Sequence, residues 1–270
     1  MNTRYNYFPV DFCKFLVKGK DCEEYKNQLM GNQNLNFKIN VCESTGEINY
    51  SFLKHKGMLL KIHSYGRITL QGSLHMLKNN GVHNHDQFTQ KDFKRALKML
   101  ESLFYVVPME LYIIQLEYGL NITGFKSHDV VTQILNGLLL HKNCKFSQTI
   151  KMGMNTCFVE HSKTTIKIYD KGGQYSTKEP ILRVEVRQDC WEKKLRYEYG
   201  LETLQDFINV DKKYFVDSLL KKWDEIIFFD YSTPELRETI YDKKSFWNDD
   251  YLKLNSCLLY TSDAADDWFC

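Results

Sequence analysis

The segment TTIKIYDKGGQYSTKEPILRVEVRQ, residues 164–188, alternates between apolar and charged residues on both sides of a Gly-Gly turn. Side chains along a strand point to opposite faces in turn, so the pattern predicts two strands with one apolar and one polar face. The apolar face holds Ile166, Ile168, Leu182, Val184 and Val186, and the polar face holds Lys167, Tyr169, Lys171, Arg183, Glu185 and Arg187. Positive neighbours favour a phenolate, and carboxylates bind Mg²⁺, so this set of groups suits phosphodiester transfer to a tyrosine.

A second carboxylate comes from the segment ELYIIQLEYGLNI, residues 110–122, which also reads as a strand. One of its faces is apolar, whereas Gln115, Glu117 and Asn121 point to the other. If these strands share one sheet, Glu117 and Glu185 converge near Tyr169. A plainer interpretation stays open, in which the charges form a solvated face, the carboxylates pair with Arg183 or Arg187, and Tyr169 is a cross-strand aromatic.

The elements around these strands predict an α+β fold. Turn residues divide residues 36–75 into successive strands, and Thr89 is a plausible N-cap for an amphipathic helix over 90–104. A further helix is predicted over 129–140, two strands around 144–160, and helices from 191 onward. We therefore expect a mostly antiparallel sheet with helices packed on one face and a polar catalytic face on the other, followed by a helical C-terminal segment.

This order predicts four parts. Residues 1–35 form an N-terminal segment, 36–190 the α+β catalytic domain, and 191–256 a helical extension that is cut short. The stretch CLLYTSDAADD, residues 257–267, resembles a translated transposase sequencing adapter, so residues 257–270 are expected to be an artefact. The tail holds three Asp and no Lys or Arg, so without it the net charge rises from +2 to a mildly basic +5, which permits a nucleic-acid partner.

Composition narrows the class of protein. The 270 residues are 43% hydrophobic and 14% aromatic, enough for a substantial core. No apolar run approaches the roughly 20 residues of a membrane helix, and the N-terminus lacks the apolar segment of a signal peptide. The eight cysteines include no CxxC pair, which argues against a disulfide scaffold or a zinc ribbon. We therefore expect a protein of the reducing cytoplasm with no membrane partner.

Several short motifs, taken together in their order and spacing, resemble the gene II replication proteins of filamentous phages and the related plasmid and prophage initiators. They are GSLH (72–75), HNHDQF (83–88), LEYGLNI (116–122), KIYDKGGQ (167–174), ILRVEVR (181–187) and YGLETLQDF (199–207). The resemblance covers roughly residues 60–210. It implies an enzyme that nicks one strand of origin DNA, becomes linked to the 5′ phosphate through tyrosine, leaves a 3′ hydroxyl that primes rolling-circle synthesis, and later rejoins the displaced strand.

Transferred to this sequence, the resemblance implies that Tyr169 is the nucleophile and that Lys171 stabilises the phenolate or the scissile phosphate. Glu117 and Glu185 would hold Mg²⁺ or Mn²⁺. The related plasmid initiators carry a tyrosine on the preceding strand, whereas KFSQTIKMGMNTCFVEH has none, so Tyr175 stays a second candidate nucleophile. The expected DNA-binding residues are Lys167, Arg183, Arg187, Asn84 and Asn121.

The implied partners are double- and single-stranded origin DNA with the host helicase and polymerase, in the cytoplasm of a bacterial cell. Two rival interpretations stay open. His83 and His85 could bind metal as in HUH nicking enzymes, although their flanking Asn, Gly and Asp residues favour a solvated loop that Asn84 and Phe88 order. The polar face could also be a non-catalytic platform for single-stranded nucleic acid, with Tyr65, Tyr169 and Phe88 stacking on bases.

Overall fold

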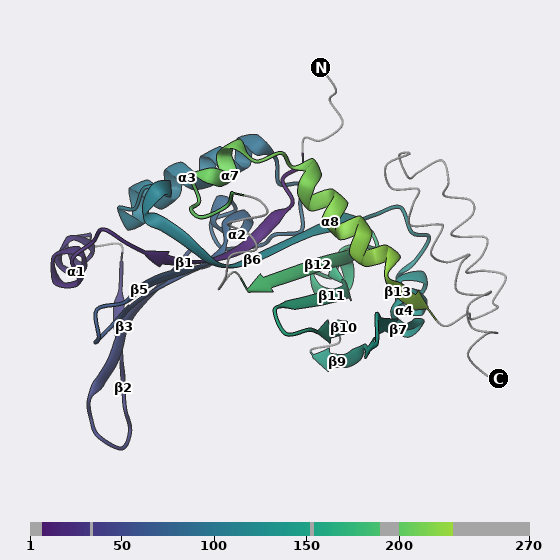
Figure 1. Cartoon of the computed structure of the whole chain (residues 1–270), viewed down its shortest axis with the longest axis horizontal. Coiled ribbons are helices and arrows are strands. Elements are labelled where there is room, and N and C mark those ends of the chain that lie inside the picture. Colours follow the sequence, from purple (N-terminus) through teal and green to yellow (C-terminus); the bar gives the residue numbers. More distant parts are fainter. Residues whose placement is uncertain (1–6, 33–34, 152–153, 190–199, 229–270) are drawn as a thin grey trace. The chain divides into compact units, whose positions relative to one another are not determined.

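The computed structural model describes residues 7–32, 35–151, 154–189 and 200–228. They form an α+β fold with a ten-stranded antiparallel sheet, in the order β2-β3-β4-β5-β1-β6-β12-β11-β10-β9, and a three-stranded sheet, β13-β7-β8 (Figure 1). The predicted fold class is confirmed. The chain divides into two compact units, residues 1–118 with 188–212 and residues 119–187 with 213–270. The segment predicted to be helical at 191–199 and the adapter-like residues 257–270 lie outside the described residues.

The strands of the first unit follow each other as antiparallel neighbours. They are β2 (Phe37–Val41), β3 (Ile48–His55), β4 (Met58–His63), β5 (Ile68–Ser73), β1 (Val10–Val17) and the first part of β6 (Leu111–Ile122). Met58, Leu60 and Ile62 are buried at every second position of β4, which is the alternation that predicted strands here. Strand β1 pairs with both β5 and β6, although no strand was predicted in that segment of the sequence.

Helices α2 (Leu74–Lys78) and α3 (Gln90–Phe104) lie together on one side of β1 and β5 (Figure 1). Helix α3 has the predicted bounds, and Thr89 forms a reciprocal capping box with Asp92. Its buried side chains fall at helical spacing: Phe93, Ala96, Leu97, Leu100 and Phe104. Helix α1 (Cys22–Met30) follows β1 and is capped by the Asp21 carboxylate. In the described part of the chain, no helix is both long and apolar enough to span a membrane.

The first unit is completed by a segment from far along the chain. Strand β6 begins after the short 3-10 helix η2 (Pro108–Glu110), and residues 202–204 pair with its first residues. Ile113 donates its backbone N–H to Glu202 O at 2.9 Å, and Leu204 donates its own to Leu111 O at 2.9 Å. Leu204 is buried, as is Phe207 in the following turn α7 (Asp206–Asn209). These bonds satisfy backbone groups that would otherwise form an open strand edge.

The second unit contains the end of β6 together with β12 (Leu182–Asp189), β11 (Thr164–Asp170), β10 (Met154–Glu160) and β9 (Ser147–Lys151). The apolar faces of β11 and β12 are buried as predicted. Helix α4 (His128–Asn136) packs on β10 and β11. A four-residue helix, α5 (Lys171–Gln174), rather than a simple turn, follows β11.

Two predicted segments of this unit differ from the structure. The helix predicted over 129–140 ends at Asn136, because Gly137 is its C-cap and strand β7 (Leu138–His141) follows. Strand β7 pairs with β8 (Cys144–Lys145) and with β13 (Ile226–Phe228). The chain beyond 191 is therefore not uniformly helical, since α8 (Lys213–Asp224) leads directly into β13.

Candidate active site

The predicted polar face on β11 and β12 brings Tyr169 and Glu185 together. Tyr169 donates a hydrogen bond from Oη to Glu185 Oε2 at 3.2 Å. Two cations also hold this carboxylate: Lys167 Nζ lies 3.5 Å from Oε1, and Arg183 Nε lies 3.4 Å from Oε2. The alternation in the sequence therefore predicted the shared face of these side chains correctly.

This face is not the solvated surface that the plainer interpretation expects. Glu185 is 5% exposed and Arg183 1%, and Lys171, which was predicted on this face but is the first residue of α5, is 0% exposed. Burying a charge is costly unless it is paired, and here the buried carboxylate and guanidinium are partners. Arg183 also donates from Nη1 to Asn121 Oδ1 at 3.0 Å, so the predicted DNA-binding Asn121 is held by the same group.

Glycine lets β6 and β12 approach closely beside the site. A Cβ atom on Gly119 would lie 2.4 Å from Val184 O, 3.0 Å from Glu185 Cα and 3.1 Å from Arg183 Nε. No side chain fits that space. The glycine of the motif LEYGLN thus has a steric role, since it admits the strand that carries Arg183 and Glu185.

Asp170, the residue between Tyr169 and Lys171, is held by His128, a pairing that the sequence did not indicate. His128, the first residue of α4, places Nδ1 2.8 Å from Asp170 Oδ2 and Nε2 3.1 Å from Thr177 O. The other carboxylate oxygen of Asp170 accepts from Gly173 N at 2.8 Å and caps α5. Both ring nitrogens face acceptors, which the protonated imidazolium satisfies, and the hydrogen bond to Asp170 raises the pKa of His128.

Gly172 shows why this corner needs a small residue. Its added Cβ would lie 2.7 Å from Glu179 O and 2.9 Å from His128 Cε1. Asp170 is thus the N-cap of α5, and Gly172 allows the first turn of this helix to pack closely against its neighbours. A cap could have been predicted from the Asp and Gly residues, but its histidine partner lies 42 residues away.

The other predicted site residues lie at different places. Tyr175 follows α5, and its backbone N–H reaches Lys171 O at 3.3 Å, so it stays a candidate nucleophile. Arg187 donates to Thr165 Oγ1 at 2.9 Å, further along β12. Glu117 lies in the first unit, opposite Phe12 in the β1–β6 register, and its sharing of a metal with Glu185 stays a prediction.

The HNHDQF loop of the first unit is ordered by a polar network. Asn84 donates to Asp11 Oδ2 at 2.7 Å, and Phe88 is buried and stacks on His75 with ring centroids 4.8 Å apart. Asp86 accepts from Lys78 and is paired with His75. These contacts support the interpretation that Asn84 and Phe88 order the loop. The contact of Asn84 with DNA stays a prediction.

The network also sets the charge of Asp86. Burial raises the pKa of this carboxyl, but hydrogen bonds from Lys78, Asn79 and His75 outweigh burial and lower the pKa to about 2. The side chains of His83 and His85 are neighbours, with ring centroids 4.3 Å apart. Across the described residues, no group of three or more His, Cys, Asp or Glu side chains is placed to hold a metal ion.

Glu185 is the carboxylate on the β11–β12 face, and its binding of Mg²⁺ or Mn²⁺ stays a prediction. Mg²⁺ is often held by one or two carboxylates together with substrate phosphates. A cation already lies against Oε1, because the ammonium group of the partly exposed Lys167 is 3.5 Å away. A metal ion at Glu185 would have to displace this ammonium group from Oε1.

Comparison with known proteins gives a structural likeness and no sequence match. No family model and no curated protein matches the chain. Among solved structures, the chain is similar to the rolling circle replication initiator protein from Geobacillus stearothermophilus, at 13% identity and a TM-score of 0.46, over 93% of this chain and 96% of that one. A likeness at this level says nothing of activity, which has to be argued from the residues.

Proposed function

We propose that the protein is a rolling-circle replication initiator, a metal-dependent nickase that attacks one strand of origin DNA with the phenol of Tyr169 and later rejoins the displaced strand. The observation that carries this proposal is the hydrogen bond from Tyr169 Oη to the buried Glu185. A partly buried phenol usually has an acceptor, and here the acceptor is a carboxylate, a group that can also act as a base. Here the carboxylate is placed to accept the phenolic proton, and cations surround the pair.

In the proposed step, Tyr169 Oη attacks the scissile phosphorus while Glu185 takes the phenolic proton. The Oη–P bond forms and the P–O3′ bond breaks. The 3′ oxygen leaves with the bonding electron pair and is protonated by solvent. The products are a 5′ phosphotyrosine and a free 3′ hydroxyl, and rejoining is the reverse, with Glu185 returning the proton to the leaving phenol.

Positive side chains would stabilise the charge that develops on the phosphate. Lys167 and Arg183 already lie within 3.5 Å of the Glu185 carboxylate, and Lys171 follows Tyr169 by two residues. Preorganised charges in a site from which water is largely excluded act more strongly than charges in water. When bound, Mg²⁺ or Mn²⁺ held by Glu185, with Glu117 as the predicted second ligand, would polarise the phosphate oxygens.

The test compares tyrosine variants on supercoiled plasmid that carries the DNA flanking the gene. Tyr169→Phe keeps the ring and removes only the attacking oxygen, so the covalent 5′ adduct should vanish. Losing one hydrogen bond costs about 0.5–1.5 kcal/mol, so the fold should survive. Tyr175→Phe is the matched control and should form the adduct. The reverse result would leave the proposed reaction standing and make Tyr175 the nucleophile. Binding without any adduct, in wild type as well, would favour the non-catalytic single-stranded binder.

Glu185→Gln distinguishes the two roles of the carboxylate. Cleavage should fall by about 10²–10⁴-fold, the usual worth of a general base. Partial recovery at high Mg²⁺ would indicate lost metal binding, and recovery at high pH would indicate the lost proton acceptor. Tyr169→Phe should recover under neither condition. Cleavage at the wild-type rate in Glu185→Gln would contradict both roles.

A further inference from the structure

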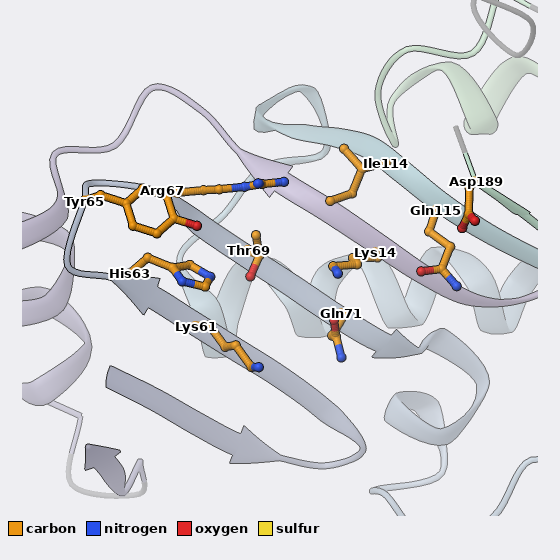
Figure 2. Close-up of a pocket in the computed structure, with 10 residues that line it drawn as sticks. All are labelled: Lys14, Lys61, His63, Tyr65, Arg67, Thr69, Gln71, Ile114, Gln115 and Asp189. Carbon is orange, nitrogen blue, oxygen red and sulfur yellow. The ribbon is translucent and has the colours of Figure 1, made fainter. Parts of the chain in front are cut away.

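The polar face of the first unit carries a hollow of about 220 Å³, separate from the residues of the proposed nicking step. Figure 2 shows lining side chains from β4, β5, β1 and β6, with Tyr65 and Arg67 on the turn between β4 and β5 and Asp189 at the end of β12. Those that matter here are Lys14, Lys61, His63, Tyr65, Arg67 and Gln115. The apolar side chains at the alternate positions of the same strands are buried, so one face of the sheet packs on the core and the other carries the hollow.

Three cations converge on this hollow. The sheet register places Lys14 opposite Gln71 and Lys61 opposite Thr69, which puts their side chains on one face. The pKa of His63 is lowered by burial, and then by the charges of Lys61, Arg67 and Lys14. All three charges therefore act on one imidazole. The hollow also has an acidic lining residue, Asp189, which lies at the end beside Gln115 (Figure 2).

Aromatic rings alternate with these cations. The rings of Tyr50 and His63 lie 5.5 Å apart, and those of His63 and Tyr65 lie 5.0 Å apart. Lys61 Nζ lies 4.4 Å from the centroid of Tyr50. Tyr65 is 69% exposed, which leaves much of its ring open to a ligand. A ring so exposed, beside cations, can stack on an unpaired base.

The positive surface continues beyond the hollow. A second, shallower depression of about 550 Å³ shares Tyr65 and Arg67 and reaches Lys18 and Lys20. Lys18 Nζ lies 3.7 Å from the centroid of the Tyr112 ring, while Lys20 is paired with Glu110 at 3.1 Å. Two adjoining depressions with cations along them suit a linear polyanion better than a single small ion.

We propose that this groove binds single-stranded DNA, with a base stacked on Tyr65 and the backbone phosphates beside Lys61, Arg67 and Lys14. The ring of Tyr65 can stack only on an unpaired base, because the faces of paired bases are covered by their neighbours in the duplex. The choice of DNA as the ligand rests on the proposed function. The groove belongs to the first unit, and binding at it requires no cleavage.

The experiment measures binding alone. Affinity for a short labelled oligo-dT strand is followed by fluorescence anisotropy in a Tyr169→Phe background, so that no adduct forms. Tyr65→Ala should weaken binding about tenfold, within the range measured for one base–aromatic stack, and Tyr65→Phe should restore it. Arg67→Gln should weaken binding and lower the salt slope by about one. Arg95→Gln removes the same charge from the exposed surface of α3 and is the matched control.

Each outcome decides the proposal. Tyr65→Ala should bind a blunt duplex as the parent does, since paired bases offer no free face. Single-strand affinity unchanged in Tyr65→Ala, an equal loss on duplex, or equal effects of Arg67→Gln and Arg95→Gln would overturn the proposal. So would a tenfold preference for oligo-U RNA over DNA. If the groove does not bind single strands, the wild-type protein should still form the Tyr169 adduct. If the wild-type protein forms no adduct, binding at the groove should remain.

Discussion

Replacing Gly119 by alanine should destabilise the second unit, because the new methyl group meets backbone rather than a flexible side chain. Its carbon would lie 2.4 Å from Val184 O, whereas ordinary contact begins at 3.4 Å. The strands would have to part by about 1 Å, and overpacking of this kind costs about 1–3 kcal/mol. For a protein of this size, 2 kcal/mol lowers the melting temperature by about 4–8 °C.

The assay is thermal unfolding followed by circular dichroism, with Gly31→Ala as the control. Gly31 closes α1 with φ −65°, and an added Cβ would meet only ordinary contacts at 3.4 and 3.8 Å. That substitution should be neutral, or stabilising by about 0.4–1 kcal/mol. A melting temperature of Gly119→Ala within about 1 °C of wild type, or an equal loss in Gly31→Ala, would refute the reasoning. Because Glu185 Cα is also within 3.0 Å of the new atom, adduct formation should fall as well.

Two further variants test contacts elsewhere. The raised pKa of His128 means that its bond to Asp170 adds stability fully below pH ~6.5, and that this charge-dependent part is lost as the pH rises through the folded-state pKa. The melting-temperature difference between wild type and His128→Gln should therefore shrink from pH 5.5 to 8.5, and a constant difference would contradict the assignment. Tyr25→Phe removes a buried hydrogen bond from the hydroxyl to Phe104 O at 2.5 Å. Urea unfolding should show a loss of about 1–3 kcal/mol, the cost of leaving a buried carbonyl unsatisfied, and no loss would mean that water replaces the hydroxyl.

Local patterns predicted much of the fold. Strand alternation placed Tyr169 and Glu185 on one face, because the apolar alternates of both strands had to be buried on the other. Helix α3 was predicted to the residue, since its capping signal and apolar spacing coincide.

Long-range relations were beyond the sequence. Strand β1 was missed because its partners, β5 and β6, lie about 50 to 100 residues away and leave no local mark. The burial of Arg183 and Lys171 was missed for a related reason, since charged residues are normally outside and only a tertiary partner overrides that rule. The same applies to the bond between His128 and Asp170.

The pairing of residues 202–204 with the start of β6 has a consequence during protein synthesis. Leu111 and Ile113 leave the ribosome roughly 90 residues before Glu202 and Leu204, and at about 5–20 residues per second this is a delay of roughly 5–20 s. Through that interval the backbone groups of Leu111 and Ile113 that later bond to residues 202–204 stay unbonded, a template for pairing with a neighbouring nascent chain. Polysomes carrying this message would therefore be expected to recruit chaperones until residue 204 has emerged and closed the strand.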